Sequence, residues 1–355
     1  CMIGFSFCKP ILNRRFTIQQ VKQKIKDELN KMTKEEVLSL LLTAGEPVSG
    51  EHICRQLGVT RAAVWKAIDQ LRQEGYTIEA APRRGYTLTA RPDRLDTAQV
   101  RGYLAGHPWQ PLVTAVERVD STNNACKRLA AEGAPDGTAV LTGMQTAGRG
   151  RRGRTFVSPP GGLYFSLILR PHAQPEALMH LTAMVAVAAA RAIERVSGVY
   201  PGIKWTNDLV LGKKKLCGIL TESSLLPDGS AAWLVVGIGV NVGQASFPPD
   251  IADMATSLAL QELDVSPDAL ADAILAQLTA MRTVLTDPVE WLAEYRRRCV
   301  NLGRPVRVLR GNTVRQATAL AIDEQFGLTV QYENGETETV RSGEVSVRGL
   351  YGYIE

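Results

Sequence analysis

Residues 145–154 read Gln-Thr-Ala-Gly-Arg-Gly-Arg-Arg-Gly-Arg and follow an apolar run at 139–142 that predicts a strand. Glycine allows a positive φ and close backbone approach, and arginine offers forked donors to phosphate or carboxylate. The segment lacks the Lys-Ser/Thr ending of a P-loop, and a predicted strand at 163–169 follows it where a dinucleotide motif would open a helix. It therefore predicts a loop that is mobile when empty and orders around an anion. The alternative, an arginine-glycine tail that binds nucleic acid, is disfavoured because the segment lies inside a patterned domain.

The chain around this loop alternates helical and strand-like patterns from Asp96 to about Cys299, as α/β and α+β domains do. Residues 177–196 predict a buried core helix because Arg191 and Glu194 near its end argue against a membrane span. Strands are predicted at 113–116, 139–142, 163–169, 216–221 and 233–242.

The last third of the chain has a different pattern. Short alternating segments surround Asn334-Gly335, a strong hairpin signal, and predict a small β-barrel of about fifty residues from Gly303 to Glu355. Its strands are expected at 306–309, 317–322, 328–332 and 344–347.

Residues 33–90 have the pattern of a winged helix-turn-helix. Helices are predicted over 34–43, from Ser49 to Gly58 and from Arg61 to Glu74, and a hairpin with a basic tip at 82–85 follows them. Thr60, Arg61, Ala62, Ala63 and Lys66 lie on or near the start of the third helix, which would enter a major groove, and Arg83 and Arg84 tip the wing. The alternative is a helical module that binds another protein.

Composition limits the chemistry that remains. The 355 residues carry a net charge of +5, which is only mildly basic, and their hydrophobic and charged content is normal for a globular protein. The six cysteines are widely spaced with no CxxC pair, which indicates reduced thiols in the cytoplasm and no protein-held metal. None of the four histidines stands in a triad or HExxH context, so charged side chains and backbone donors are expected to carry the chemistry.

The first residues of the chain differ from the rest. The apolar run at 1–12 precedes its basic residues, the reverse of a signal peptide. Met32 opens the first well-patterned segment, so we expect residues 1–32 to be an extension outside the folded unit.

Several short motifs accompany the arginine-glycine loop. Asp120 to Asn124 is expected to precede a helix at 125–131 and to present hydroxyls and amides at its N-terminus. The glycines at 237 and 239 are expected to leave room for a flat ligand, with Asn241 placed to read a base edge. The motifs in chain order are Ser-Thr-Asn at 121–123, the loop at 145–154, Lys-Trp-Thr-Asn-Asp at 204–208, Lys-Leu-Cys-Gly-Ile-Leu at 215–220 and Gly-Ile-Gly-Val-Asn at 237–241.

In this order and spacing the motifs resemble the biotin protein ligase family, and the N-terminal winged helix resembles its bifunctional ligase and biotin operon repressor form. The resemblance covers residues 33–355 and implies a multidomain α+β protein. It implies a winged helix domain at 33–90, a central α/β biotin/lipoate-ligase-like catalytic domain at 91–300 and an SH3-like barrel at 301–355.

The resemblance also implies the site residues and substrates. Biotin and ATP, with Mg²⁺, would form biotinoyl-5′-AMP, and Lys215, Arg149 and Arg151 would act in catalysis. The biotin site would comprise Ser121, Thr122, Asn123, Gln145, Arg149, Gly150, Arg151 and Lys215. The nucleotide site would comprise Lys204, Asn207, Asp208 and Asn241. Thr206 replaces the family's usual proline, which loses a fixed φ and would loosen this segment.

The implied partners are the biotin carboxyl carrier protein of acetyl-CoA carboxylase, operator DNA of biotin-synthesis genes and a second copy of the chain when the adenylate is bound, with no membrane. Three alternatives stay open at this point. They are a lipoate or octanoate ligase, a ligase whose N-terminal domain no longer regulates, and a biotin-sensing transcription factor without ligase activity.

Overall fold

The computed structural model describes residues 33–81, 84–92, 95–104, 106–109, 112–170, 180–226, 230–284, 287–310, 313–341 and the backbone of 344–347. The predicted extension at 1–32 and the wing residue Arg83 lie outside these ranges. The chain divides into two compact units at Pro92. Within the described ranges no helix is long and apolar enough to cross a membrane, and the four cysteines found there form no disulfide.

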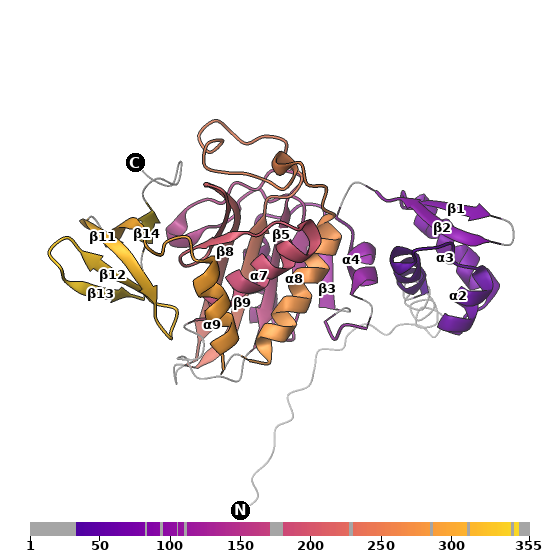
Figure 1. Ribbon diagram of the computed structural model, residues 1–355. Helices are drawn as coiled ribbons and strands as arrows, with labels where there is room; N and C mark the ends of the chain where they lie inside the picture. The colour runs from indigo at the N-terminus through magenta and orange to yellow at the C-terminus, as the bar shows by residue number, and fades with distance from the viewer. Residues whose placement is uncertain are drawn as a thin grey trace, which may run out of the picture. The chain divides into compact units, whose positions relative to one another are not determined.

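The first unit contains three helices and a hairpin, as the sequence predicts (Figure 1). A helix over 33–43 is followed by α2 (Gly50–Leu57), which Ser49 caps and Gly58 ends in the left-handed conformation, and by α3 (Arg61–Gln73), which Thr60 caps. Strands β1 (Thr77–Ala81) and β2 (Gly85–Ala90) pair antiparallel. The core that joins them is formed by Val37, Leu38, Leu41, Ile53, Val64, Ala67, Ile68, Leu71, Tyr76 and Ile78.

The second unit is built on a seven-stranded mixed sheet in the order β3-β4-β5-β9-β8-β7-β6. Only β3 and β4 pair parallel; every other neighbouring pair in this sheet is antiparallel. The strands are β3 (Val113–Val116), β4 (Ala139–Thr142), β5 (Leu163–Leu169), β6 (Gly202–Lys204), β7 (Asp208–Leu211), β8 (Lys214–Leu225) and β9 (Ala231–Val240). The short strands β6 (Gly-Ile-Lys) and β7 (Asp-Leu-Val-Leu) were not predicted, because each combines a short apolar stretch with a charged residue and neither shows the four-residue uncharged run of β3 or β4.

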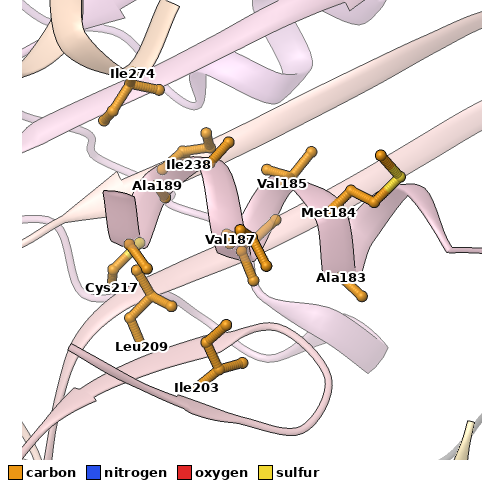
Figure 2. Packing of buried hydrophobic residues seen from close by; sticks show 14 of the residues in the cluster. Ala183, Met184, Val185, Val187, Ala189, Ile203, Leu209, Cys217, Ile238 and Ile274 are labelled. Atoms are coloured by element: carbon orange, nitrogen blue, oxygen red, sulfur yellow. The ribbon is translucent and has the colours of Figure 1, made fainter. Parts of the chain in front are cut away.

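Helices cover the two faces of this sheet differently. On one face α7 (Leu181–Ser197) packs against α8 (Pro267–Arg282), with α4 (Thr97–Tyr103) and α9 (Val289–Arg298) beside them. Figure 2 shows Val187 and Ala189 of α7 among Ile203, Cys217 and Ile238 of the sheet. The described part of the predicted core helix is therefore confirmed; it begins at Leu181, and 177–179 lie outside the described residues.

The other face of the sheet carries a smaller apolar cluster and a row of polar and small side chains. Helix α5 (Thr122–Ala131) packs here, with Cys126 and Ala130 against Val140, Ile168 and Val235. Alternation along the strands divides β5 and β9 between the faces, because successive side chains of a strand point to opposite sides. Leu167 of β5 and Val236 of β9 therefore point into the large core, and their neighbours Ile168 and Val235 point to the α5 face.

The C-terminal residues form a five-stranded antiparallel sheet in the order β13-β12-β11-β10-β14. Its strands are β10 (Pro305–Arg310), β11 (Thr313–Ile322), β12 (Leu328–Tyr332), β13 (Thr337–Val340) and β14 (Glu344–Val347), and the turn at Asn334-Gly335 joins β12 to β13 as predicted. In the described residues β13 and β14 are the two edges of this sheet and do not pair with each other. The predicted barrel is therefore not confirmed, because no closed barrel is found among the described residues.

Candidate functional site: two adjoining cavities beside the arginine-glycine loop

Two cavities lie beside the arginine-glycine loop and share three lining residues, Gly150, Phe156 and Lys215. The first cavity is lined by seven of the eight residues expected at the biotin site: Ser121, Thr122, Asn123, Gln145, Arg149, Gly150 and Lys215. The eighth, Arg151, lines the second cavity together with all four residues expected at the nucleotide site: Lys204, Asn207, Asp208 and Asn241. The structure therefore brings every residue of both predicted sets together, in two neighbouring spaces.

The N-terminus of α5 forms one wall of the first cavity. The helix begins at Thr122, with Ser121 as its N-cap, three residues earlier than the predicted start at Ala125. Thr122 and Asn123 therefore lie in its first turn and are almost fully buried. The Gln145 side chain accepts a hydrogen bond from the Thr122 backbone N–H at 2.8 Å, and its own amide donates to Ser158 Oγ at 2.9 Å. These bonds connect the helix start to both ends of the loop.

The glycines of β8 and β9 accommodate side chains of the protein in this structure. A Cβ on Gly237 would lie 1.9 Å from Asn123 Oδ1, and a Cβ on Gly239 would lie 2.7 Å from the Phe156 ring. A Cβ on Gly218 would likewise lie 2.8 Å from a carbon of the Phe156 ring. The three glycines thus line the first cavity together with the Asn123 amide and the Phe156 ring, which lie directly against their backbone.

Glu222 of β8 joins three of these segments and was not predicted as a site residue. Its carboxylate accepts hydrogen bonds from Asn123 Nδ2 at 3.0 Å, Lys127 Nζ at 2.9 Å and Arg149 Nη2 at 3.1 Å. Burial raises the pKa of Glu222, but these hydrogen bonds and the charges of Lys127 and Arg149 outweigh it and lower the pKa below its ordinary value. One feature of the sequence could have revealed Glu222 as a site residue. It lies four residues after Gly218 on the same strand, and alternation places both on the same face of the sheet.

The second cavity combines cations, carboxamides and an apolar wall. Lys215 Nζ pairs with Asp208 Oδ1 at 2.7 Å, and Arg151 Nη1 donates to Asn207 Oδ1 at 2.9 Å. The Asn241 amide donates to the Thr256 carbonyl, and its buried Oδ1 has no partner among the described residues. Phe247, Ile251, Met254 and Ala255 supply the apolar wall and were not predicted, since their loop carries no motif. A cavity with these linings suits a nucleotide, whose base is flat and whose phosphates are anionic.

The segment 204–208 is held from several sides. The Trp205 backbone N–H donates to Asn301 Oδ1 at 2.7 Å, and the Tyr295 hydroxyl donates to the Thr206 carbonyl at 3.2 Å. Trp205 Nε1 also donates to the carbonyl of Phe326, in the turn between β11 and β12 of the C-terminal sheet. These bonds restrain the segment despite the missing proline, and the expected effect of Thr206 on ATP affinity stays a prediction.

In the first unit, the predicted DNA-binding residues lie where the sequence places them. Arg61, Ala62 and Lys66 of α3 are exposed, as are its cap Thr60 and, beside the hairpin tip, Arg84; Ala63 is half-buried. No acidic residue lies in the first turn of α3. The start of this helix therefore presents a cationic surface, which suits a DNA phosphate backbone.

Comparisons with known proteins find matches to three parts of the chain. Residues 115–241 match the family model described as Biotin/lipoate A/B protein ligase family, 33–87 match an HTH domain, and 302–348 match the Biotin protein ligase C terminal domain. The chain is similar to the bifunctional ligase/repressor BirA of Bacillus spizizenii, at 38% identity over 63% of this chain and 70% of the relative. It is also similar to the protein of the same name in Escherichia coli, at 32% identity over 88% of this chain and 96% of that one.

A solved structure of a biotin protein ligase from Aquifex aeolicus, in complex with biotin and ATP, superposes with a TM-score of 0.57. The two are 29% identical over 66% of this chain and 98% of the other. The fold is thus that of a biotin or lipoate protein ligase. The chain belongs to the biotin protein ligase family, in the form that carries an N-terminal helix-turn-helix.

Proposed function

We propose that this protein is a biotin–protein ligase that also represses transcription of the biotin-synthesis operon, with biotinoyl-AMP as corepressor. The observation that carries the ligase function is the meeting of the two cavities at Gly150, Phe156 and Lys215, with Arg149 and Arg151 on either side. A carboxylate held in the first cavity and a nucleotide in the second would meet beside these cations. The helix-turn-helix unit supports the repressor function.

The reaction has two steps and needs no nucleophile from the protein. An oxygen of the biotin carboxylate attacks the α-phosphorus of MgATP, forming a P–O bond as pyrophosphate leaves. The amine of a lysine on the biotin carboxyl carrier protein of acetyl-CoA carboxylase then attacks the acyl carbon, forming an amide as AMP leaves and the amine loses a proton. The enzyme must bring two anions together and stabilise the charge that develops on the phosphoryl oxygens.

We propose the following roles for the lining residues. Lys215 leaves Asp208 to contact the biotin carboxylate and the α-phosphate, and Arg149 and Arg151 neutralise the adjoining oxygens. Ser121, Thr122, Asn123 and Gln145 hold the biotin ring system, and Gly150 allows the loop to approach it closely. Lys204, Asn207, Asp208 and Asn241 hold the nucleotide, with the unpaired Asn241 Oδ1 as an acceptor for a base amino group.

The second requirement is protection of the mixed anhydride from water. The loop at 145–154 is anchored at both ends, through the backbone N–H of Gln145, which donates to the Ser158 carbonyl at 3.1 Å, and through Phe156 N–H, which donates to Gly148 at 2.9 Å. Between these anchors, the Arg149 side chain donates to Glu222 at 3.1 Å, and the Arg151 side chain donates to Asn207 of the second cavity at 2.9 Å. We propose that this part of the loop orders over the adenylate and excludes water.

Further proposals concern organisation and place of action. The functional divisions are residues 33–90, 91–300 and 301–355, the last with an SH3-like strand arrangement, and residues 1–32 lie outside them. The adenylate-bound protein forms a homodimer whose two winged helices read a palindromic operator. Thr60, Arg61, Ala62, Ala63 and Lys66 face that DNA, and Arg83 and Arg84 contact its phosphates. The protein acts in the cytoplasm.

Pyrophosphate release from the purified protein with MgATP tests the ligase function when biotin, lipoate or no acid is supplied. Release that depends on biotin, followed by labelling of the carrier protein, is the expected result. Release with lipoate instead would indicate the related lipoate ligase activity. Absence of release with either acid would leave a biotin sensor without ligase activity.

A gel shift with the organism's biotin operon region tests the repressor function. A shift that requires both biotin and ATP is expected, since loop ordering by the adenylate is proposed to favour the dimer. No shift under any condition would leave a ligase whose N-terminal unit does not regulate. A shift that ignores both ligands would contradict the coupling between the two units.

A further inference from the structure

Trp65 of α3 carries a large apolar side chain that is 62% exposed. The five tryptophans of the chain all lie among the described residues, and Trp109, Trp205 and Trp291 are buried while Trp233 is half-buried. An exposed tryptophan leaves much apolar surface in water, and such a surface commonly marks a binding site. The fold of the first unit offers no other explanation, because Trp65 takes no part in its core.

The position of Trp65 around the helix explains why it is exposed. The buried residues of α3 are Val64, Ala67, Ile68 and Leu71, which form one stripe at helical spacing. Trp65 lies outside that stripe, on the turn that follows Arg61 and Ala62, and next to Lys66. Arg61, Ala62, Trp65 and Lys66 thus form a second stripe along the helix, and all four side chains are exposed. Trp65 therefore lies at the centre of the surface that the cations of α3 define.

Charge and chemistry together select DNA as the occupant of this surface. Arg61 and Lys66 flank the indole, the first turn of α3 holds no carboxylate, and the first acidic residue of the helix, Asp69, accepts a hydrogen bond from Gln73. A major groove offers phosphates on its rims and, at each thymine, an apolar methyl group on its floor. The side chains of Arg61 and Lys66 suit the phosphates on the rims of the groove. The flat apolar ring of Trp65 between them suits a methyl group on its floor.

We propose that Trp65 is a specificity-determining residue of the helix-turn-helix unit, and that its indole ring packs against a thymine methyl group in the major groove. The proposal rests on the DNA-binding half of the proposed function. It adds a residue that reads sequence, whereas Arg61, Lys66 and Arg84 at phosphates add affinity without selecting a base.

The test uses the full chain, with biotin and MgATP, and a duplex that the unaltered protein has selected from a randomised pool. Each thymine of that duplex is then replaced in turn by deoxyuridine, which removes the methyl group and keeps every hydrogen-bonding atom. We expect one or two replacements to weaken binding by the unaltered protein about tenfold, the scale of one lost base contact. Trp65→Ala should bind the thymine and deoxyuridine duplexes equally, and Trp65→Phe should keep part of the difference.

Controls separate this contact from loss of fold and from general affinity. Trp65→Ala removes an exposed side chain, so its circular dichroism spectrum and its biotin-dependent pyrophosphate release should match those of the unaltered protein. Arg61→Ala should weaken binding to both duplexes alike and reduce the salt dependence, as loss of a phosphate contact does.

Three results would overturn the proposal, and they are distinguishable. If Trp65→Ala keeps the full difference between thymine and deoxyuridine and sediments like the unaltered protein, Trp65 does not read the methyl group, and DNA binding by the protein stands. If the unaltered protein selects no duplex from the pool, the DNA-binding half of the proposed function fails together with this proposal. If Trp65→Ala leaves DNA selectivity unchanged but lowers the sedimentation coefficient, the indole is a contact between protein chains.

Discussion

The guanidinium of Arg149 donates a hydrogen bond to the carboxylate of Glu222 across 3.1 Å, although 73 residues separate them in the chain. The same carboxylate accepts a hydrogen bond from the side-chain amide of Asn123, at the start of α5. Through Glu222, an arginine of the loop and an amide of the first cavity are therefore fixed relative to each other. A ligand anion that binds Arg149 must compete with this carboxylate or add to it.

We expect Glu222→Gln to raise the KM for biotin about tenfold, with a smaller change in kcat. The substitution removes the charge that Lys127 and Arg149 face and places an NH₂ group against one of the donors that now bind the carboxylate. Steady-state pyrophosphate release against biotin concentration measures both constants. Glu132→Gln, at the exposed end of α5, is the matched control and should change neither.

The pH dependence of this effect follows from the pKa of Glu222, which lies below the ordinary 4.5. A carboxyl whose pKa is lowered by folding contributes stability above its unfolded pKa and loses it as the pH falls through the folded value. The difference in KM between the unaltered protein and Glu222→Gln should thus stay constant from pH 8 to pH 5. A difference that fades between those limits would show that the charge of Glu222 is not its cause.

Lys215→Ala should slow biotin-dependent pyrophosphate release by more than tenfold, equivalent to at least about 1.4 kcal/mol of transition-state stabilisation. Lys215 is the cation that lines both cavities, and its loss also leaves Asp208 without the 2.7 Å partner recorded here. Lys213→Ala, an exposed lysine two residues earlier that lines neither cavity, should release pyrophosphate at the normal rate. Equal rates for the two variants would contradict the role of Lys215.

Arg151→Gly should release the adenylate prematurely and label proteins indiscriminately. Arg151 donates hydrogen bonds from the loop to Thr206 Oγ1 and Asn207 Oδ1 of the nucleotide segment, so its loss removes these two connections. The measurement is the ratio of biotin on the carrier protein to biotin on an unrelated lysine-rich protein, with Arg118→Gly as an exposed control. Unchanged selectivity in Arg151→Gly would refute closure through this residue.

Gly237→Ala should weaken biotin binding by more than tenfold and leave the rest of the sheet folded. The added methyl group would lie 1.9 Å from Asn123 Oδ1, so the amide has to leave its bonds with Ser166 and Glu222. Isothermal titration with biotin measures the affinity, and a thermal melt measures the fold. The control is Gly143→Ala, where the nearest atom is 3.8 Å away, and which should bind biotin normally.

Local features of the sequence determined most elements, and its motifs indicated part of the lining of the two cavities. Ser49, Gly58 and Thr60 mark helix ends through bonds to their own neighbours, and the Asn334-Gly335 turn fixes a hairpin by its own backbone preference. Such signals depend on a few adjacent residues, so they can be read without the fold. The same holds for the spacing of the motifs, from which the resemblance to the biotin protein ligases follows.

Contacts between distant segments were decided only by the tertiary structure. The three donors of Glu222 are 73 to 99 residues away, and Phe156 fills the space beside Gly218 and Gly239 from a loop that crosses the sheet. Whether the C-terminal sheet closes depends on the pairing of its edge strands, and no local pattern sets that pairing. The exposure of Trp65 likewise depends on which stripe of α3 the other helices cover. The local sequence determined the helices, strands and turns. Tertiary packing determined which of them are in contact, because burial and strand pairing depend on the whole chain.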